Sequence, residues 1–179
     1  MVLWSDITDK NVIDTTPWGK EGRVKIGYEG GPLRFQIPRG RSKWGVSAYK
    51  SFQMSLNHPD FIAWWKELET FLCPQEPFNS NLKLNELRLK IDDATYIFDE
   101  NSKQVNPDIR EGLFRGQELS CLVDVESTYF FNGNWGLTCK AVQVRFYGAE
   151  AQKQPDDVDA TSTFSLPKGR CAFLEESAS

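Results

Sequence analysis

Alternation of apolar and polar residues with a period of two recurs in short segments of this chain, and it restricts the fold more than any other feature. In residues 33–37 (LRFQI) the alternation places Arg34 and Gln36 on the face opposite three apolar residues. Such a pattern is typical of a strand with one face on a core and the other in solvent. The predicted strands cover residues 23–28, 33–37, 52–56, 87–91, 94–98, 119–125 and 137–147.

One segment between these strands has helical periodicity instead. Residues 59–72 repeat apolar side chains every three to four positions and leave Lys66, Glu67 and Glu69 for solvent. Asn57 or His58 can cap the start of this helix, Pro59 suits its first turn, and Pro74 ends it. The sequence therefore predicts a single inserted helix.

Many short strands with one helix among them favour a mainly β, OB-fold-like barrel of five strands, closed or partly open. The pattern alone does not separate this barrel from a β-sandwich, which remains the alternative. Residues 1–20 are expected to form an extended N-terminal lead-in, residues 21–149 the OB-fold domain, and residues 150–179 a flexible, mildly acidic tail. Asn132-Gly133 predicts a hairpin turn between the last two strands.

The sequence offers few groups for catalysis. His58 is the only histidine, and its expected place at a helix cap argues against a Ser-His-Asp or Cys-His arrangement. No glycine-rich phosphate loop is present. Adjacent carboxylates, as at Asp92-Asp93, usually point to opposite sides of a strand or lie in turns. We therefore expect a protein that is not an enzyme and that needs no cofactor or metal.

The cysteines and the length of the apolar runs indicate in which cellular compartment the protein is expected to work. Cys73, Cys121, Cys139 and Cys171 are widely spaced and form no C-x-x-C pair, so they are expected to be reduced structural thiols. No apolar run approaches the roughly 20 residues that span a bilayer, and the first residues lack the features of a signal peptide. An intracellular protein without a membrane partner is expected.

Positive charge is concentrated in one part of an acidic chain. Residues 20–50 hold eight lysines and arginines and two glutamates, a formal charge of +6, whereas the whole chain has a formal net charge of -4. Within this segment, residues 38–50 (PRGRSKWGVSAYK) set Trp44 and Tyr49 among four cations without any acid. Such a distribution is typical of a polyanion site. The alternative is a solvated basic edge whose partners lie across the fold.

Cations interleaved with rings match a single-stranded nucleic acid, which presents a line of phosphates and unstacked bases. The polar faces of the predicted strands supply some cations, and the 39–50 loop supplies more cations and two rings. For any one ring, burial in the core or as a lid is the alternative. The predicted nucleic-acid interface comprises Arg23, Lys25, Arg34, Arg39, Arg41, Lys43, Trp44, Tyr49, Lys50, Trp135, Lys140 and Arg145.

Three segments also resemble a known family. LRFQIPRGRSKWGVSAY, KSFQMSLNHPDF and FNGNWGLTCKAVQVRFY resemble the single-stranded DNA-binding proteins of large eukaryotic DNA viruses, which are related to the replication single-stranded DNA-binding protein of short-tailed phages. The resemblance spans roughly residues 30–147 and has a weaker counterpart in GRCAF near the end. It implies an OB-fold with an inserted helix and sequence-nonspecific binding of single-stranded DNA in replication, recombination and repair.

The resemblance also implies an acidic C-terminal tail that ends in an aromatic residue and competes with DNA for the basic groove. Through this tail the protein would contact DNA polymerase, primase-helicase or other replication proteins, and a homodimer would be compatible with the family. Lys168, Arg170 and the terminal Ser179 depart from the family's tail. If the protein is viral, the host nucleus or a cytoplasmic viral replication site is its expected location. The corresponding tail residues here are Asp156, Asp157, Asp159, Phe173, Glu175 and Glu176.

Other functions stay open at this point. A protein–protein interaction or virion structural module with a β-sandwich fold would use exposed aromatics to meet another protein. A carbohydrate-binding barrel would also use Trp and Tyr platforms, but it would give the cations no purpose. An enzyme ranks last.

Overall fold

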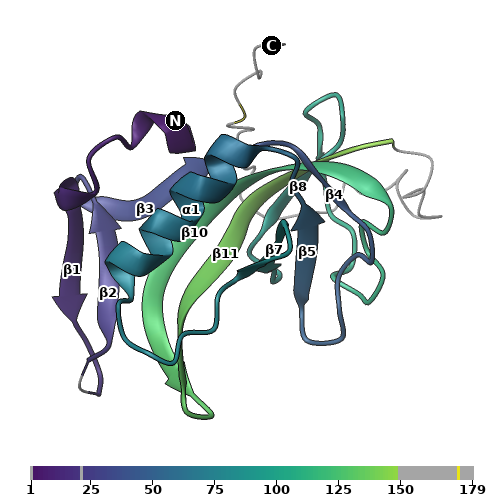
Figure 1. Cartoon of the computed structure of the whole chain (residues 1–179). Coiled ribbons are helices and arrows are strands. Elements are labelled where there is room, and N and C mark those ends of the chain that lie inside the picture. Colours follow the sequence, from purple (N-terminus) through teal and green to yellow (C-terminus); the bar gives the residue numbers. More distant parts are fainter. Residues whose placement is uncertain (1, 21, 149–172, 174–179) are drawn as a thin grey trace.

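The computed structural model describes residues 2–20, 22–148 and 173. In this part of the chain one sheet of eleven strands is accompanied by one α-helix and two short 3-10 turns (Figure 1). The helical elements are η1 (Trp4–Asp6), η2 (Lys10–Val12) and α1 (Pro59–Leu72). The strands are β1 (Ile13–Pro17), β2 (Val24–Tyr28), β3 (Gly31–Gln36), β4 (Gly40–Ser42), β5 (Ser51–Ser55), β6 (Leu82–Lys83), β7 (Glu86–Lys90), β8 (Tyr96–Phe98), β9 (Gln104–Val105), β10 (Gln117–Phe131) and β11 (Asn134–Tyr147).

A ring of five strand positions closes, in which β3 and β4 follow one another along the same edge of β10 and share one position. β10 pairs with β11 along one edge and with β3 and then β4 along the other. β5 lies between β4 and β7, and β7 completes the ring by pairing in parallel with β11 at Lys90 and Lys140. The predicted OB-fold-like five-stranded barrel is thereby confirmed in its closed form. Because one ring joins all five positions, the alternative of two packed sheets in a β-sandwich is wrong.

Along β3 the core follows the alternation in the sequence with one exception. Leu33, Phe35 and Ile37 are buried, as predicted. Gln36 was expected on the polar face but is 1% exposed, because the N-terminal segment covers this part of β3. The backbone N–H of Gln36 donates to the carbonyl oxygen of Val2 at 2.9 Å. A partner from a distant part of the chain thus overrides the local pattern.

The helix α1 forms where it was predicted. The Nδ1 atom of His58 accepts the backbone N–H of Phe61 at 3.1 Å, and Pro59 begins the first turn. Phe61 and Trp65 lie on the buried face, and the Trp65 ring centroid is 6.1 Å from that of Phe35 on β3. The helix therefore packs against the barrel through aromatic side chains.

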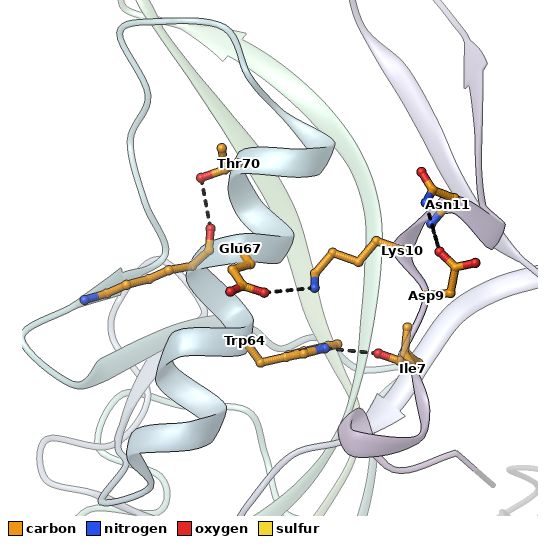
Figure 2. Close-up of polar contacts among 8 residues, drawn as sticks. Ile7, Asp9, Lys10, Asn11, Trp64, Glu67 and Thr70 are labelled. Atoms are coloured by element: carbon orange, nitrogen blue, oxygen red, sulfur yellow. Dashed lines mark hydrogen bonds and ion pairs between the residues drawn. The ribbon is translucent and has the colours of Figure 1, made fainter.

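The predicted N-terminal lead-in is part of this packed body. Trp64 of α1 donates its indole N–H to the carbonyl oxygen of Ile7 at 3.2 Å, and Lys10 forms an ion pair with Glu67 at 3.2 Å (Figure 2). Ile7 is 2% exposed. β1 follows and pairs with β2, an element that the sequence analysis did not predict.

Three of the four cysteines lie in the described residues. Cys73, Cys121 and Cys139 are free and buried, and burial raises the pKa of each thiol. They therefore behave as small apolar side chains, as expected. Cys171 lies outside the described residues. In the part of the chain that the structure describes, no helix is long and apolar enough to cross a membrane.

Candidate nucleic-acid interface

The outward-facing side chains of β5 and β7 are polar or basic, and the register of the two strands sets them side by side. Ser51 pairs with Lys90, and Gln53 pairs with Arg88. The residues that alternate with these four are buried in the core, so the four side chains point away from it. In an OB-fold the second and third barrel strands, together with the loops beside them, form the surface that binds oligonucleotides. β5 and β7 hold these two positions in the present barrel.

Aromatic side chains border this surface on two sides. Tyr49 lies in the loop before β5 and is 92% exposed. Phe131, at the end of β10, is 68% exposed, and Tyr129 is half-buried. These rings and the basic strands line one pocket of about 350 Å³, which we call the proximal groove. Its lining residues are Tyr49, Ser51, Asn81, Arg88, Lys90, Tyr129, Phe131, Leu137, Thr138 and Cys139.

The position of Tyr129 depends on the glycine across the hairpin. Tyr129 on β10 pairs with Gly136 on β11. The Tyr129 ring lies so close to Gly136 that a Cβ atom there would overlap it. Gly136 therefore lets the ring lie against the strand, where it forms part of the groove's wall.

Cations come together at the joint between β7 and β11. Lys90 and Lys140 are register partners across this joint, and Lys140 forms an ion pair with Asp92 at 2.8 Å. Partial burial acts to raise the pKa of Asp92, but the hydrogen bonds from Lys140 and from the backbone of Ala94 outweigh it, so the pKa lies below its usual value. Asp92 is therefore ionised at neutral pH and offsets the charge of Lys140, whereas Lys90 is exposed.

A hydrogen-bond network that includes buried groups holds the Arg88 side chain in position. Arg88 donates to the Oδ1 atom of Asn81 at 3.3 Å, and the amide of Asn81 donates to the carbonyl oxygen of Leu137 at 2.9 Å. The backbone N–H of Asn81 in turn donates to Glu69 on α1 at 3.0 Å, and Ser80 donates to the same carboxylate at 2.6 Å. The helix thus fixes the segment that positions Arg88.

Glu69 gives this network a pH dependence. Its side chain was expected in solvent but is 3% exposed, because Ser80 and Asn81 pack over it and bind its carboxylate. Burial raises its pKa despite these hydrogen bonds. The folded state therefore holds a proton that the unfolded chain releases at a lower pH, near the ordinary glutamate value of about 4.3. This contribution to stability is fully present below that pH and is lost as pH rises through the folded pKa.

We therefore expect the free energy of unfolding of the wild type to fall relative to that of Glu69→Gln as pH rises from about 4 towards 7. Urea unfolding of both proteins across this range measures the difference. Glu111→Gln, at an exposed glutamate, controls for the change in net charge. A difference between wild type and Glu69→Gln that stays constant with pH would contradict the assignment.

Several predicted cations lie away from the proximal groove and form ion pairs with acidic residues. Arg34 donates to both carboxylate oxygens of Asp124, at 2.7 and 2.9 Å, and this hydrogen bonding to the carboxylate raises the pKa of Arg34. Arg39 and Arg41 both lie near Glu118, with N–O distances of 3.7 and 3.4 Å. The basic edge therefore has partners across the fold, as the alternative interpretation of the charge cluster expected.

One of these cations, Arg39, and a further arginine, Arg145, also contact other groups. The guanidinium of Arg39 lies 3.7 Å from the ring centroid of Tyr147, and that of Arg145 lies 5.2 Å from the same ring. Arg145 also donates to the carbonyl oxygen of Glu100 at 2.7 Å. These residues gather around the end of β11, at the opposite end of that strand from the 132–133 turn.

The predicted loop divides between two environments. Tyr49 lines the proximal groove, and Lys50 is exposed directly before β5. Trp44 is 61% exposed, and the Nζ atom of Lys43 lies 5.1 Å from its ring centroid. Trp44 and Lys43 do not line that groove.

Three further predicted residues lie on the other side of the β10–β11 hairpin. Trp135 packs beside Phe130, with ring centroids 5.2 Å apart, and Arg23 donates to the carbonyl oxygen of Phe130 at 3.1 Å. Lys25 lies on β2, 5.2 Å from the ring of Trp18. Among the described residues, the structure brings only Tyr49, of the predicted set, directly into the lining of the proximal groove, with Lys50 and Lys140 beside it.

The groove contains four residues that the sequence analysis missed. Arg88 and Lys90 alternate with buried leucines in ELRLK, within a segment that was predicted as a strand. The alternation applied to β3 would have placed both cations outward. Tyr129 and Phe131 flank the Asn132-Gly133 turn on its N-terminal side, and the alternation along β10 puts them on one face.

Most of the predicted tail residues lie outside the described part of the chain: Asp156, Asp157, Asp159, Glu175 and Glu176. Phe173 is described, and its ring packs edge-on against Phe98 of β8 with a centroid distance of 6.5 Å. In the described residues no group of three or more His, Cys, Asp or Glu side chains could hold a metal ion.

Comparison with known proteins gives structural neighbours without sequence relatives. No family model matches the chain, and no curated protein matches it. The C-terminally truncated single-stranded DNA-binding protein from bacteriophage Enc34 is 8% identical with a TM-score of 0.49, over 76% of this chain and 95% of that one. gp2.5, a single-stranded DNA-binding protein encoded by bacteriophage T7, is 10% identical with a TM-score of 0.46, over 79% of this chain and 100% of that one. Both are phage proteins, so the resemblance to proteins of large eukaryotic DNA viruses stays a prediction.

Proposed function

We propose that this protein binds single-stranded DNA without sequence preference, through the proximal groove, and that it catalyses no reaction. The observation that carries the proposal is the pairing of exposed rings, Tyr49 and Phe131, with the cations Arg88 and Lys90 on the oligonucleotide-binding strands of an OB-fold-like barrel. Stacked bases and neutralised phosphates are the two interactions by which single strands are bound without sequence readout.

The chemistry of the groove supports a single strand over a duplex. Tyr49 and Phe131 can contact only bases whose faces are free, and a duplex hides these faces in its stack. Arg88 and Lys90 lie on β7, between the loop that carries Tyr49 and the hairpin that carries Phe131. There they can contact successive phosphates of a bound strand. Discrimination against duplex DNA follows from the rings, and affinity at low salt follows from the cations.

The wider role is proposed from the sequence resemblance. Replication would be the main process, with recombination and repair beside it, because each exposes single-stranded DNA. Contacts with DNA polymerase or primase-helicase through the tail, and a homodimer, are further predictions. They do not affect the assignment of the groove.

Neutralising the groove cations tests the proposal. For Arg88→Gln/Lys90→Gln, the plot of log affinity against log salt should flatten by about 1.4, since each lost phosphate contact on a single strand removes about 0.7 from the slope. Fluorescence anisotropy of labelled oligo-dT, with duplex DNA as a control, measures both affinity and slope. Lys90→Gln alone, at an exposed position, separates the charge effect from any loss of the Arg88–Asn81 hydrogen bond.

The variant Arg39→Gln/Arg41→Gln/Lys43→Gln is the matched comparison, because it removes more charge outside the groove. Arg39 and Arg41 share Glu118, so the triple variant should weaken binding less than the groove variant does. If the triple variant weakens binding more, the interface lies on the loop and the β4 edge. Absence of oligo-dT binding by the wild type at low salt would refute the function itself.

A further inference from the structure

A second basic and aromatic groove lies on the opposite face of the β10–β11 hairpin tip from the proximal groove. It is open, has a volume of about 650 Å³, and lies between the turn that joins β1 to β2 and the end of the β10–β11 hairpin. We call it the distal groove. Its lining residues are Gly19, Lys20, Arg23, Phe130 and Trp135.

The aromatic wall of the distal groove is held in place by its neighbours. Phe130 and Trp135 are direct partners across the hairpin, and their ring centroids lie 5.2 Å apart. Gly22 packs onto the Trp135 ring, where a Cβ atom would lie 2.7 Å from the indole. Its φ of 82° is also one that glycine adopts readily. Phe130 nevertheless stays 43% exposed, so part of the wall faces solvent.

The opposite wall is basic, with Lys20 and Arg23 in the lining, and a third ring, Trp18, lies beside the groove with Lys25 on the same β1–β2 hairpin. Lys20 and Lys25 are exposed, and Trp18 is 44% exposed with the Nζ atom of Lys25 5.2 Å from its ring centroid. Arg23 is half-buried and reaches across to the carbonyl oxygen of Phe130 at 3.1 Å. In the sequence, residues 18–25 (WGKEGRVK) contain three cations and one acid. The groove therefore combines positive charge with exposed rings, as the proximal groove does.

The two grooves share one hairpin. Along the end of β10, Tyr129 and Phe131 line the proximal groove, while Phe130 between them lines the distal groove. Successive residues of a strand point to opposite faces, so a short hairpin tip separates the two surfaces. The turn at Asn132-Gly133 is exposed, so the tip is accessible to solvent.

We propose that a single strand of DNA bound in the proximal groove continues over the β10–β11 hairpin tip into the distal groove, so that the two grooves form one extended binding site. This inference rests on the proposed function. The occupant is assigned by charge complementarity and by continuity with the proximal groove. The hairpin tip would lie under the strand, with stacking positions on both sides of it.

Length dependence distinguishes one groove from two. An OB-fold covers roughly 4–16 nucleotides, so labelled oligo-dT would be prepared from about 4 to about 30 nucleotides. The variants are Lys20→Gln/Lys25→Gln and, separately, Trp18→Ala. Lys66→Gln/Lys103→Gln, at two exposed lysines outside both grooves, is the matched control for the change in charge.

For the shortest oligo-dT that the wild type binds, both distal variants should bind with wild-type affinity. For the longest oligo-dT, the double lysine variant should show a salt slope smaller by up to about 1.4. Trp18→Ala should lose roughly fivefold or more in affinity, the effect of one lost stacking contact. The control should change neither value.

Three other results are informative. Wild-type affinity of both distal variants for every length would overturn the distal groove and leave the proximal groove intact. An equal loss of affinity at all lengths would also overturn the distal groove, because the lysines would then act only through the overall electrostatic potential of the protein. If the wild type binds no oligo-dT of any length, the proposed function fails and the extension fails with it.

Discussion

Replacing Tyr49 and Phe131 together with alanine is expected to cost about 2–6 kcal/mol of the free energy of binding to oligo-dT, because each stacked base contributes about 1–3 kcal/mol. That range corresponds to a loss in affinity of at least roughly 30-fold. Both side chains are largely exposed, so the free energy of unfolding should change by less than about 0.5 kcal/mol. Anisotropy titrations at one salt concentration, with urea unfolding beside them, measure both quantities.

The effect of this double variant should differ from a general loss of aromatic surface. Phe71→Ala removes a ring that is 41% exposed on α1, and its affinity for oligo-dT should equal that of the wild type. Trp44→Ala removes an exposed ring of the predicted loop that lies outside the groove lining. If Trp44→Ala weakens binding as much as the double variant, the loop is part of the interface and the groove boundaries are wrong.

Phe35→Ala is expected to lower the free energy of unfolding by about 3–5 kcal/mol, which is the usual cost of deleting a buried aromatic ring. Phe35 is fully buried, at 0% exposure, and its ring lies edge-on to Trp64 at 5.1 Å and close to Trp65 at 6.1 Å. It therefore connects the barrel with the helix and, through Trp64 and Ile7, with the N-terminal segment. Urea unfolding, with an unchanged dependence on denaturant, provides the measurement.

The matched control is again Phe71→Ala, because it deletes the same side chain at a partly exposed site. Its free energy of unfolding should stay within about 0.5 kcal/mol of the wild type. A loss below about 1.5 kcal/mol for Phe35→Ala would mean that the helix moves inward and fills the cavity. In that case the contact between β3 and α1 would contribute less than its burial indicates.

The strands and the helix could be predicted because their signals are local. The period-two segments became β2, β3, β5, β7 and β8, and the helix begins at Pro59 behind its His58 cap. β1 was missed because Ile13–Pro17 pairs along one edge only with β2 and has one buried residue. Gln36 was assigned to the wrong face because its cover comes from Val2 and Leu3, which no local pattern connects with β3.

The candidate site was harder to predict for the same reason. Arg34, Arg39 and Arg41 cluster in sequence with few acids nearby, but Asp124 and Glu118 on β10 pair with them in the fold. The register of β3 and β4 with β10 sets these pairs, and composition carries no information on register. The segment that supplies Arg88 and Lys90 has no excess of charge, so a search for clusters of cations passes over it.

The closed ring has a consequence for the motions of the groove. In the described residues, β5 and β7 pair firmly with each other but join β4 only at Arg41–Ser55 and β11 only at Lys140–Lys90. β6 pairs with β7 as well, and a three-stranded unit with such short edges should open locally at a lower free energy than global unfolding. Lys90 lies on one side of the joint between β7 and β11, and Phe131 lines the same groove from the hairpin on the other side, so a single strand that contacts both would hold the joint shut. Binding and barrel closure would then stabilise each other to the same extent.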